Sequence, residues 1–125
     1  MTPATVLLRQ VHPNFISAGE PSSQAFFPFA KDDGKLSVYD GDQITAEASF
    51  QHYTQTQQLS SHSVWGITSG EVATVGLSSA ADSLDGFPSH AIVDFSGHPE
   101  KDFRKLAKKL KALAFQRGCL FQPTA

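Results

Sequence analysis

The fold is decided by residues 89–118, which read SHAIVDFSGHPEKDFRKLAKKLKALAFQRG. Residues 89–95 alternate between two largely apolar faces, which is typical of a central strand covered on both sides. Pro99 suits the first position of a helix, and Gly118 suits the position just after a helix ends. The stretch therefore predicts a central strand followed by one long helix that ends at Arg117.

The predicted helix carries one apolar stripe and one basic stripe. The apolar residues follow the i, i+3, i+4, i+7 spacing of a buried helix face, and they are Phe103, Leu106, Ala107, Leu110, Leu113 and Ala114. Most of the cations of the chain also lie in this helix: Lys101, Arg104, Lys105, Lys108, Lys109, Lys111 and Arg117. We expect a continuous cationic stripe made of Lys101, Arg104, Lys105, Lys108 and Lys111.

Charge is distributed unevenly along the chain. Residues 1–99 hold three Lys and Arg against ten Asp and Glu, which gives −7, whereas residues 100–125 hold seven against two, which gives +5. Such segregation is typical of a surface that meets an acidic partner. The alternative is a solvated outer face that only keeps an amphipathic helix in solution.

Length and composition limit the class of protein. The chain has 125 residues, the size of one domain, so we expect a single domain over 1–125. The lone Cys119 excludes an internal disulfide and a zinc site built on paired cysteines. The sequence shows neither a signal peptide nor a membrane span, which favours a cytoplasmic protein with no membrane partner.

The first half of the chain contains segments that resemble strands. Residues 4–11 are rich in aliphatic and β-branched residues and predict the first strand. Residues 23–29 and 35–39 flank turn residues at 32–34, and this pattern predicts a hairpin.

Further elements follow from capping and turn signals. Thr45 is a suitable N-cap for a helix over 45–58, and residues 62–67 predict another strand. The segment Thr68-Ser69-Gly70-Glu71 has the spacing of a capping box and predicts a short helix through about Val75. Residues 77–88 predict a surface loop, and residues 119–121 a short final strand.

The predicted order is therefore β-β-β-α-β-α-β-α-β. Hairpins come first and alternating units follow, a pattern that favours an α+β fold. We expect a single compact domain with a mixed, mainly antiparallel sheet, packed by about three helices that include the basic C-terminal one.

One cluster of polar residues is a candidate active site. Tyr39 and Asp40 lie at the end of a predicted strand, and Arg9 and His12 lie on or just after the first strand. In such a pocket Arg9 would fix an anionic group, His12 or Asp40 would move a proton, and Tyr39 would donate a hydrogen bond. The alternative is a plain turn at Asp40-Gly41-Asp42.

The other sequence patterns provide no sign of a metal or cofactor. None of the five histidines belongs to a metal-binding motif, no serine has a nucleophile-elbow context, and no phosphate-binding loop is present. We therefore expect neither metal nor cofactor.

The leading hypothesis is a small bacterial-type binding protein, either immunity- or antitoxin-like or a regulatory subunit. It would dock onto an acidic protein through the basic helix, with Phe27, Phe29 or Trp65 as exposed anchors. The first alternative is a small enzyme that acts on a phosphorylated or nucleotide substrate at the Arg9 pocket. The second is a nucleic-acid-binding module, which the net charge of −2 disfavours.

Overall fold

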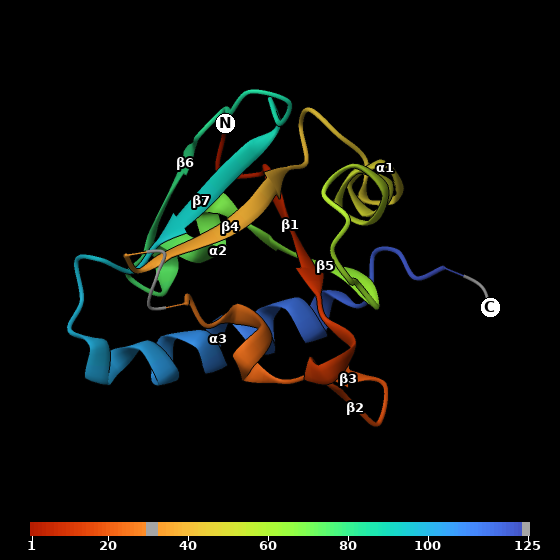
Figure 1. Ribbon diagram of the computed structural model, residues 1–125. Coiled ribbons are helices and arrows are strands. Elements are labelled where there is room, and N and C mark those ends of the chain that lie inside the picture. The colour runs from red at the N-terminus through yellow and green to blue at the C-terminus, as the bar shows by residue number, and fades with distance from the viewer. Residues whose placement is uncertain (30–32, 124–125) are drawn as a thin grey trace.

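Five strands form the central sheet in the computed structural model, which describes residues 1–29 and 33–123 (Figure 1). All neighbouring strands in this sheet are antiparallel, and their order is β5-β1-β4-β7-β6. The strands are β1 (Val6–Val11), β4 (Lys35–Asp40), β5 (Ser63–Thr68), β6 (Ser78–Ala81) and β7 (His90–Asp94). A two-stranded ribbon of β2 (Ile16–Ser17) and β3 (Glu20–Pro21) forms a second, smaller sheet.

In the described part of the chain, three α-helices pack on the sheet: α1 (Ala46–Gln51), α2 (Ser69–Thr74) and α3 (Phe103–Arg117). One 3₁₀ turn, η5 (Glu100–Asp102), precedes α3, so the α-helix begins later than Pro99. It ends before Gly118, whose φ of +94° is in the region that favours glycine. The α+β fold, the mainly antiparallel sheet and the C-terminal helix predicted from the sequence are confirmed.

The sheet contains antiparallel neighbours only, whereas the sequence pattern predicted a mixed sheet. A parallel pair requires a crossover that returns to the same sheet beside its starting strand. Here β5 pairs with β1 instead of β4, and α2 leads from β5 at one edge of the sheet to β6 at the other. Helices α1 and α2 therefore connect strands that are not neighbours.

Helices α2 and α3 cover one face of the sheet and enclose the main core. The apolar stripe of α3 points into this core as predicted, with Leu110 and Ala114 fully buried and only Leu113 partly exposed. From the sheet, Leu36 and Val38 of β4 face the same core. A 3₁₀ turn, η2 (Ser23–Phe26), also contributes here by burying Ala25 and Phe26.

The opposite face of the sheet is covered only in part. Helix α1 and the π-helical turn η4 (His52–Thr56) pack their apolar side chains over β1 and β5, where Leu8 and Val64 are buried. Strand β7 was expected to be covered on both sides, and this is correct for one face only. Ala91 and Val93 are fully buried toward α3, whereas Ile92 on the other face is partly exposed.

Two further predicted elements are wrong. Residues 77–88 contain strand β6, which pairs with β7 at the sheet edge, although the sequence predicted a loop. Residues 23–29 do not pair with β4: they contain η2, so the predicted hairpin does not form. Part of its predicted turn, residue 32, lies outside the described residues. The segment packs its apolar side chains against α3 instead.

Two other elements are shorter or less regular than predicted. The helix predicted over 45–58 is α1 followed by the π-helical turn η4, although Thr45 caps it as expected by accepting from the Ala48 N–H at 3.1 Å. Residues 119–121 form one β-bridge, Phe121 with Val64, and no strand.

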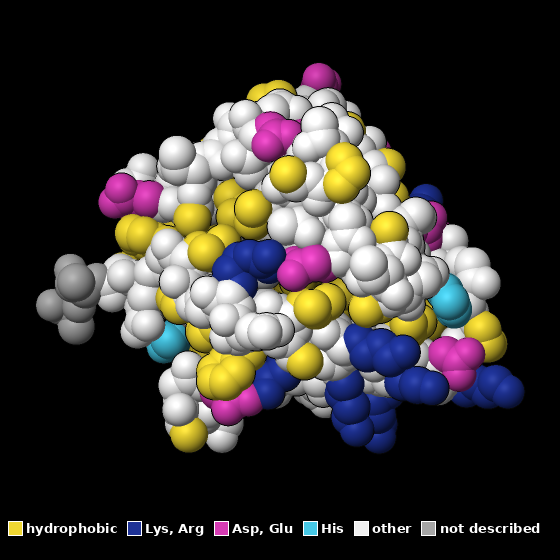
Figure 2. All heavy atoms as spheres, turned by 180° about the vertical axis from the view of Figure 1, so that it is seen from behind, with side chains coloured by type: hydrophobic (Ala, Val, Ile, Leu, Met, Phe, Trp, Pro, Cys, Tyr) yellow, Lys and Arg dark blue, Asp and Glu magenta, His cyan; other side chains and the backbone are white. Residues whose placement is uncertain are grey.

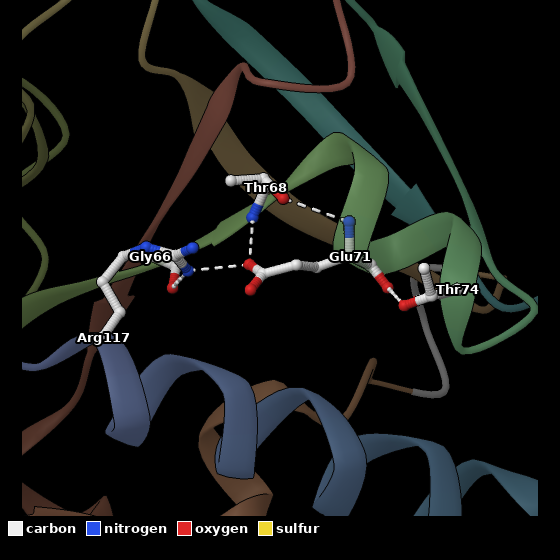
Figure 3. A network of polar contacts seen from close by, with 5 residues as sticks. All are labelled: Gly66, Thr68, Glu71, Thr74 and Arg117. Atoms are coloured by element: carbon white, nitrogen blue, oxygen red, sulfur yellow. Dashed lines mark hydrogen bonds and ion pairs between the residues drawn. The ribbon is translucent and has the colours of Figure 1, made fainter.

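The predicted capping box opens α2 (Figure 3). The Thr68 backbone N–H donates to Glu71 Oε1 at 2.8 Å, and the Glu71 N–H donates to Thr68 Oγ1 at 3.0 Å. Arg117 at the end of α3 donates to the same Glu71 oxygen at 2.7 Å and to the Gly66 carbonyl at 3.0 Å. This network ties the C-terminus of α3 to the start of α2.

Replacing Glu71 with glutamine is expected to lower the free energy of unfolding at pH 7 by about 1 kcal/mol, because the neutral amide keeps the capping role but loses the ion pair with Arg117. Burial raises the pKa of Glu71, but hydrogen bonds from Arg117 and Thr68 outweigh it and hold the pKa below its usual range. A lowered folded-state pKa stabilises the fold at pH values above the unfolded-state pKa. The difference between the two proteins should therefore disappear as the pH falls through the folded-state pKa.

Urea unfolding of both proteins between pH 7 and pH 3 measures this difference. A stability gap that stays constant over that range would contradict the assigned role of the Glu71 charge.

Candidate functional site

The cations of α3 and η5 gather on one side of the molecule, and Figure 2 shows Lys and Arg side chains along the lower edge of that view. Five of the exposed cations form no ion pair and no hydrogen bond with a described residue. We call them the α3 cationic surface: Lys101, Arg104, Lys105, Lys108 and Lys109. These charges are available to a partner.

The other two cations of this segment have intramolecular partners. Lys111 forms an ion pair with Glu20 of β3, and its ammonium lies 5.2 Å from the centre of the Phe115 ring. Arg117 is held by Glu71. The predicted stripe is therefore shorter than expected, because Lys111 holds the β2–β3 ribbon to the helix.

Of the three aromatic residues predicted as exposed anchors, only Phe29 is exposed, with 51% of its surface accessible. Trp65 is buried in the main core, where its indole N–H donates to Ser63 Oγ at 2.8 Å and its ring stacks on Phe115. Phe27 packs edge-on against Phe103 of α3. The prediction that Trp65 is an exposed anchor is wrong.

The four residues of the predicted pocket do not converge on one point. Leu7 of β1 pairs with Asp40, so His12, five residues further along, lies roughly 16 Å from that end of the sheet. His12 caps the 3₁₀ turn η1 (Pro13–Phe15) by accepting from the Asn14 N–H at 3.0 Å. The buried Asp40 accepts from the Asp42 backbone N–H at 2.9 Å and from the Gln43 side-chain amide at 3.1 Å.

Arg9 and Tyr39 lie closer together, and both line one cavity. The register between β1 and β4 consists of two pairs, Leu7 with Asp40 and Leu8 with Tyr39. Beyond these pairs the Arg9 guanidinium links the two strands. It donates to the Ala25 carbonyl at 2.7 Å and to the Ser37 carbonyl at 2.8 Å.

The cavity has a volume of about 400 Å³ and lies on the partly covered face of the sheet. This volume is within the usual range for sites that bind small molecules. Its walls are mainly aromatic and aliphatic, and they include Tyr53, Leu84 and Phe87. Of the described residues that line it, none is Asp or Glu, while Arg9 and Lys35 are cationic. The cavity therefore suits a molecule with an apolar group and a neutral or anionic polar group.

Tyr39 already has a hydrogen-bond partner in the cavity wall. Its hydroxyl lies 2.8 Å from His52 Nδ1, and His52 Nε2 lies 3.0 Å from the Gly86 carbonyl. Because a carbonyl only accepts, His52 carries its proton on Nε2 and Nδ1 accepts from Tyr39. Burial raises the pKa of the Tyr39 phenol above its usual range, and Tyr53 raises it further. Tyr39 is thus a fixed, neutral donor to His52.

A second polar chain runs along the same wall. Ser37 Oγ lies 3.1 Å from His90 Nε2, and His90 Nδ1 lies 3.1 Å from Asp82 Oδ2. Sequence analysis assigned no role to Ser37 or Asp82, because neither belongs to a motif. The signal that reveals Ser37 is the strand register: Tyr39 pairs with His90, so Ser37 is the diagonal neighbour of His90.

The described residues include no group of three or more His, Cys, Asp or Glu side chains arranged to hold a metal ion. They also include no helix that is long and apolar enough to span a bilayer.

Comparison with protein-family models, with curated proteins and with solved structures found no match. A function must therefore be inferred from two features of the structure, the α3 cationic surface and the cavity on the opposite side of the sheet.

Proposed function

We propose that the protein is a small cytosolic binding module, either immunity- or antitoxin-like or a regulatory subunit, that docks through the α3 cationic surface onto an acidic protein. The supporting observation is that five exposed cations form no ion pair with a described residue. Because α3 is packed on the sheet, the spacing of these cations is fixed, and it can match a rigid acidic patch on a partner protein. Such complementarity speeds encounter and selects partners.

A protein partner is favoured over nucleic acid because of the charge elsewhere in the chain. Residues 1–99 carry −7, so a long polyanion that extends past α3 would meet repulsion, whereas a compact acidic patch would not. Domains that bind nucleic acid are generally basic overall, and this chain has a net charge of −2.

The alternative of an enzyme built on Arg9, His12, Tyr39 and Asp40 has less support. His12 and Asp40 lie near opposite ends of β1, and the Tyr39 hydroxyl is already bonded to His52.

Replacing Lys105 and Lys108 with glutamine is expected to slow association with the partner about fivefold at low salt, because two of the steering charges are lost. The effect should shrink at 0.5 M salt, where exposed charges are screened. A low-salt pull-down identifies the partner, and stopped-flow mixing then measures the association rate constant.

The matched control replaces Gln51 and Gln55 with glutamate. Both residues are exposed on α1 and η4, and this change shifts the net charge by the same −2. Equal slowing in the control would show that only total charge matters and would overturn the docking surface. Recovery of nucleic acid without protein, or of no partner at all, would also overturn the proposal.

A further inference from the structure

The polar chain of Ser37, His90 and Asp82 has the geometry of an activated nucleophile. Its two links, each 3.1 Å long, fall within the range for a serine, a base and a group that orients the base. The three residues come from β4, from the start of β7 and from the segment just after β6. Adjacent strands hold Ser37 and His90 at a fixed separation.

The hydrogen bonds of His90 determine its tautomer. Nδ1 faces two acceptors, the Asp82 carboxylate at 3.1 Å and the Asp82 carbonyl at 2.9 Å. Nδ1 therefore carries the proton, and the free lone pair of neutral His90 is on Nε2. That lone pair points at Ser37 Oγ, so Ser37 donates and His90 accepts. This is the arrangement required of a general base.

The three side chains differ in their exposure to solvent, and this difference suits different roles. The His90 side chain is 9% exposed and the Asp82 side chain 50% exposed, while Ser37 is exposed and lines the cavity. The base is therefore shielded from water, whereas the serine oxygen is accessible to a molecule in the cavity.

We propose that Ser37 is a nucleophile activated by His90 and that it cleaves esters or thioesters with an apolar acyl group. Ser37 Oγ forms a bond to the acyl carbon while its proton passes to His90 Nε2. The bond to the alcohol or thiol then breaks, and His90 returns the proton to that leaving group. Water, with His90 again as base, hydrolyses the Ser37 ester and releases a carboxylic acid.

The cavity indicates the substrate class. Aromatic and aliphatic walls such as Phe87 and Leu84 suit an apolar acyl chain or ring. Lys35 precedes Ser37 by two residues on the same face of β4 and also lines the cavity. Lys35 and Arg9 bring positive charge to the wall of the cavity that the serine also lines, and such charge stabilises the negative charge that develops on the acyl oxygen. Asp82 is a positioning residue that holds His90 in the required tautomer.

The first test labels the native protein with an alkyl fluorophosphonate, which bonds to the serine oxygen with loss of fluoride, and locates the adduct by mass spectrometry. Ser60 is the reference within the same chain, because it is exposed and forms no side-chain hydrogen bond with a described residue. We expect Ser37 to react at least about 100-fold faster than Ser60, since a positioned base contributes on that scale. Equal rates would overturn the proposal, and because only wild-type protein is used, misfolding cannot explain them.

The second test follows hydrolysis of 4-nitrophenyl butyrate. Ser37→Ala should abolish turnover, and His90→Gln should lower the rate about 100-fold. Asp82→Asn should have a smaller effect, because the Asp82 backbone carbonyl still accepts from Nδ1. Ser60→Ala is the matched control and should leave turnover unchanged, because Ser60 is exposed and forms no side-chain hydrogen bond with a described residue. Full turnover in folded Ser37→Ala would overturn the assignment.

Discussion

Replacing Phe95 with alanine is expected to lower the free energy of unfolding by about 3–5 kcal/mol, the usual cost of truncating a buried phenylalanine. Phe95 directly follows β7 and is fully buried. Its ring lies edge-on to Phe103, the first residue of α3, with the ring centres 5.3 Å apart. The change leaves a cavity where the helix meets the sheet, and urea unfolding at pH 7 measures the loss.

Phe29→Ala is the matched control, because the same side chain is removed from a position that is 51% exposed. Its cost should stay below about 1 kcal/mol, as for most surface substitutions. A loss at Phe95 no larger than that at Phe29 would contradict the description of the core.

Replacing Gly41 with alanine is expected to cost about 3 kcal/mol, the upper end of the usual penalty for overpacking. A Cβ at this position would lie 2.3 Å from the Val6 carbonyl oxygen, which accepts the Gly41 N–H at 2.8 Å. Backbone, and not a flexible side chain, blocks the added carbon. Relief therefore requires β1 and β4 to separate at the end where they are paired. Thermal and urea unfolding both measure the loss.

Gly97→Ala serves as the control, since a Cβ there meets nothing within 4 Å. We expect its effect on the free energy of unfolding to be within about 0.5 kcal/mol. Equal stability of the Gly41 and Gly97 variants would refute the close approach at Gly41.

Local signals were enough to predict much of the fold. The apolar stripe of α3, its end before Gly118 and the capping box at Thr68 each depend on residues within a turn or two of one another. The alternation of Leu36 and Val38 likewise reports which face of β4 is buried. Such patterns can be interpreted without knowing how the rest of the chain folds.

Elements that depend on distant partners could not be predicted in the same way. Strand β6 reads Ser-Ser-Ala-Ala, which has little strand preference, and it is a strand because Ser79 pairs with Val93. Phe26 belongs to an apolar run that resembles a strand, yet the run folds as η2 and packs against α3.

The site formed by Ser37, His90 and Asp82 could not be predicted either, because it also depends on pairing between distant segments. Ser37 and His90 are 53 residues apart in the sequence, and only the register of β4 on β7 brings them together. Asp82 reaches His90 because β6 pairs with β7, and β6 was predicted to be loop. Four of the five cations predicted for the stripe are exposed, but the sequence did not predict that the fifth, Lys111, pairs with Glu20.

The burial of Trp65 has a practical consequence. It is the single tryptophan of the sequence and lies on β5, and its indole stacks on Phe115 of α3 with ring centres 6.1 Å apart. The fluorescence of an indole depends on its surroundings, so emission from Trp65 reports whether α3 is seated on the sheet. The chain thus contains an intrinsic optical probe of the helix that carries its cations, and no external dye is needed to follow that helix.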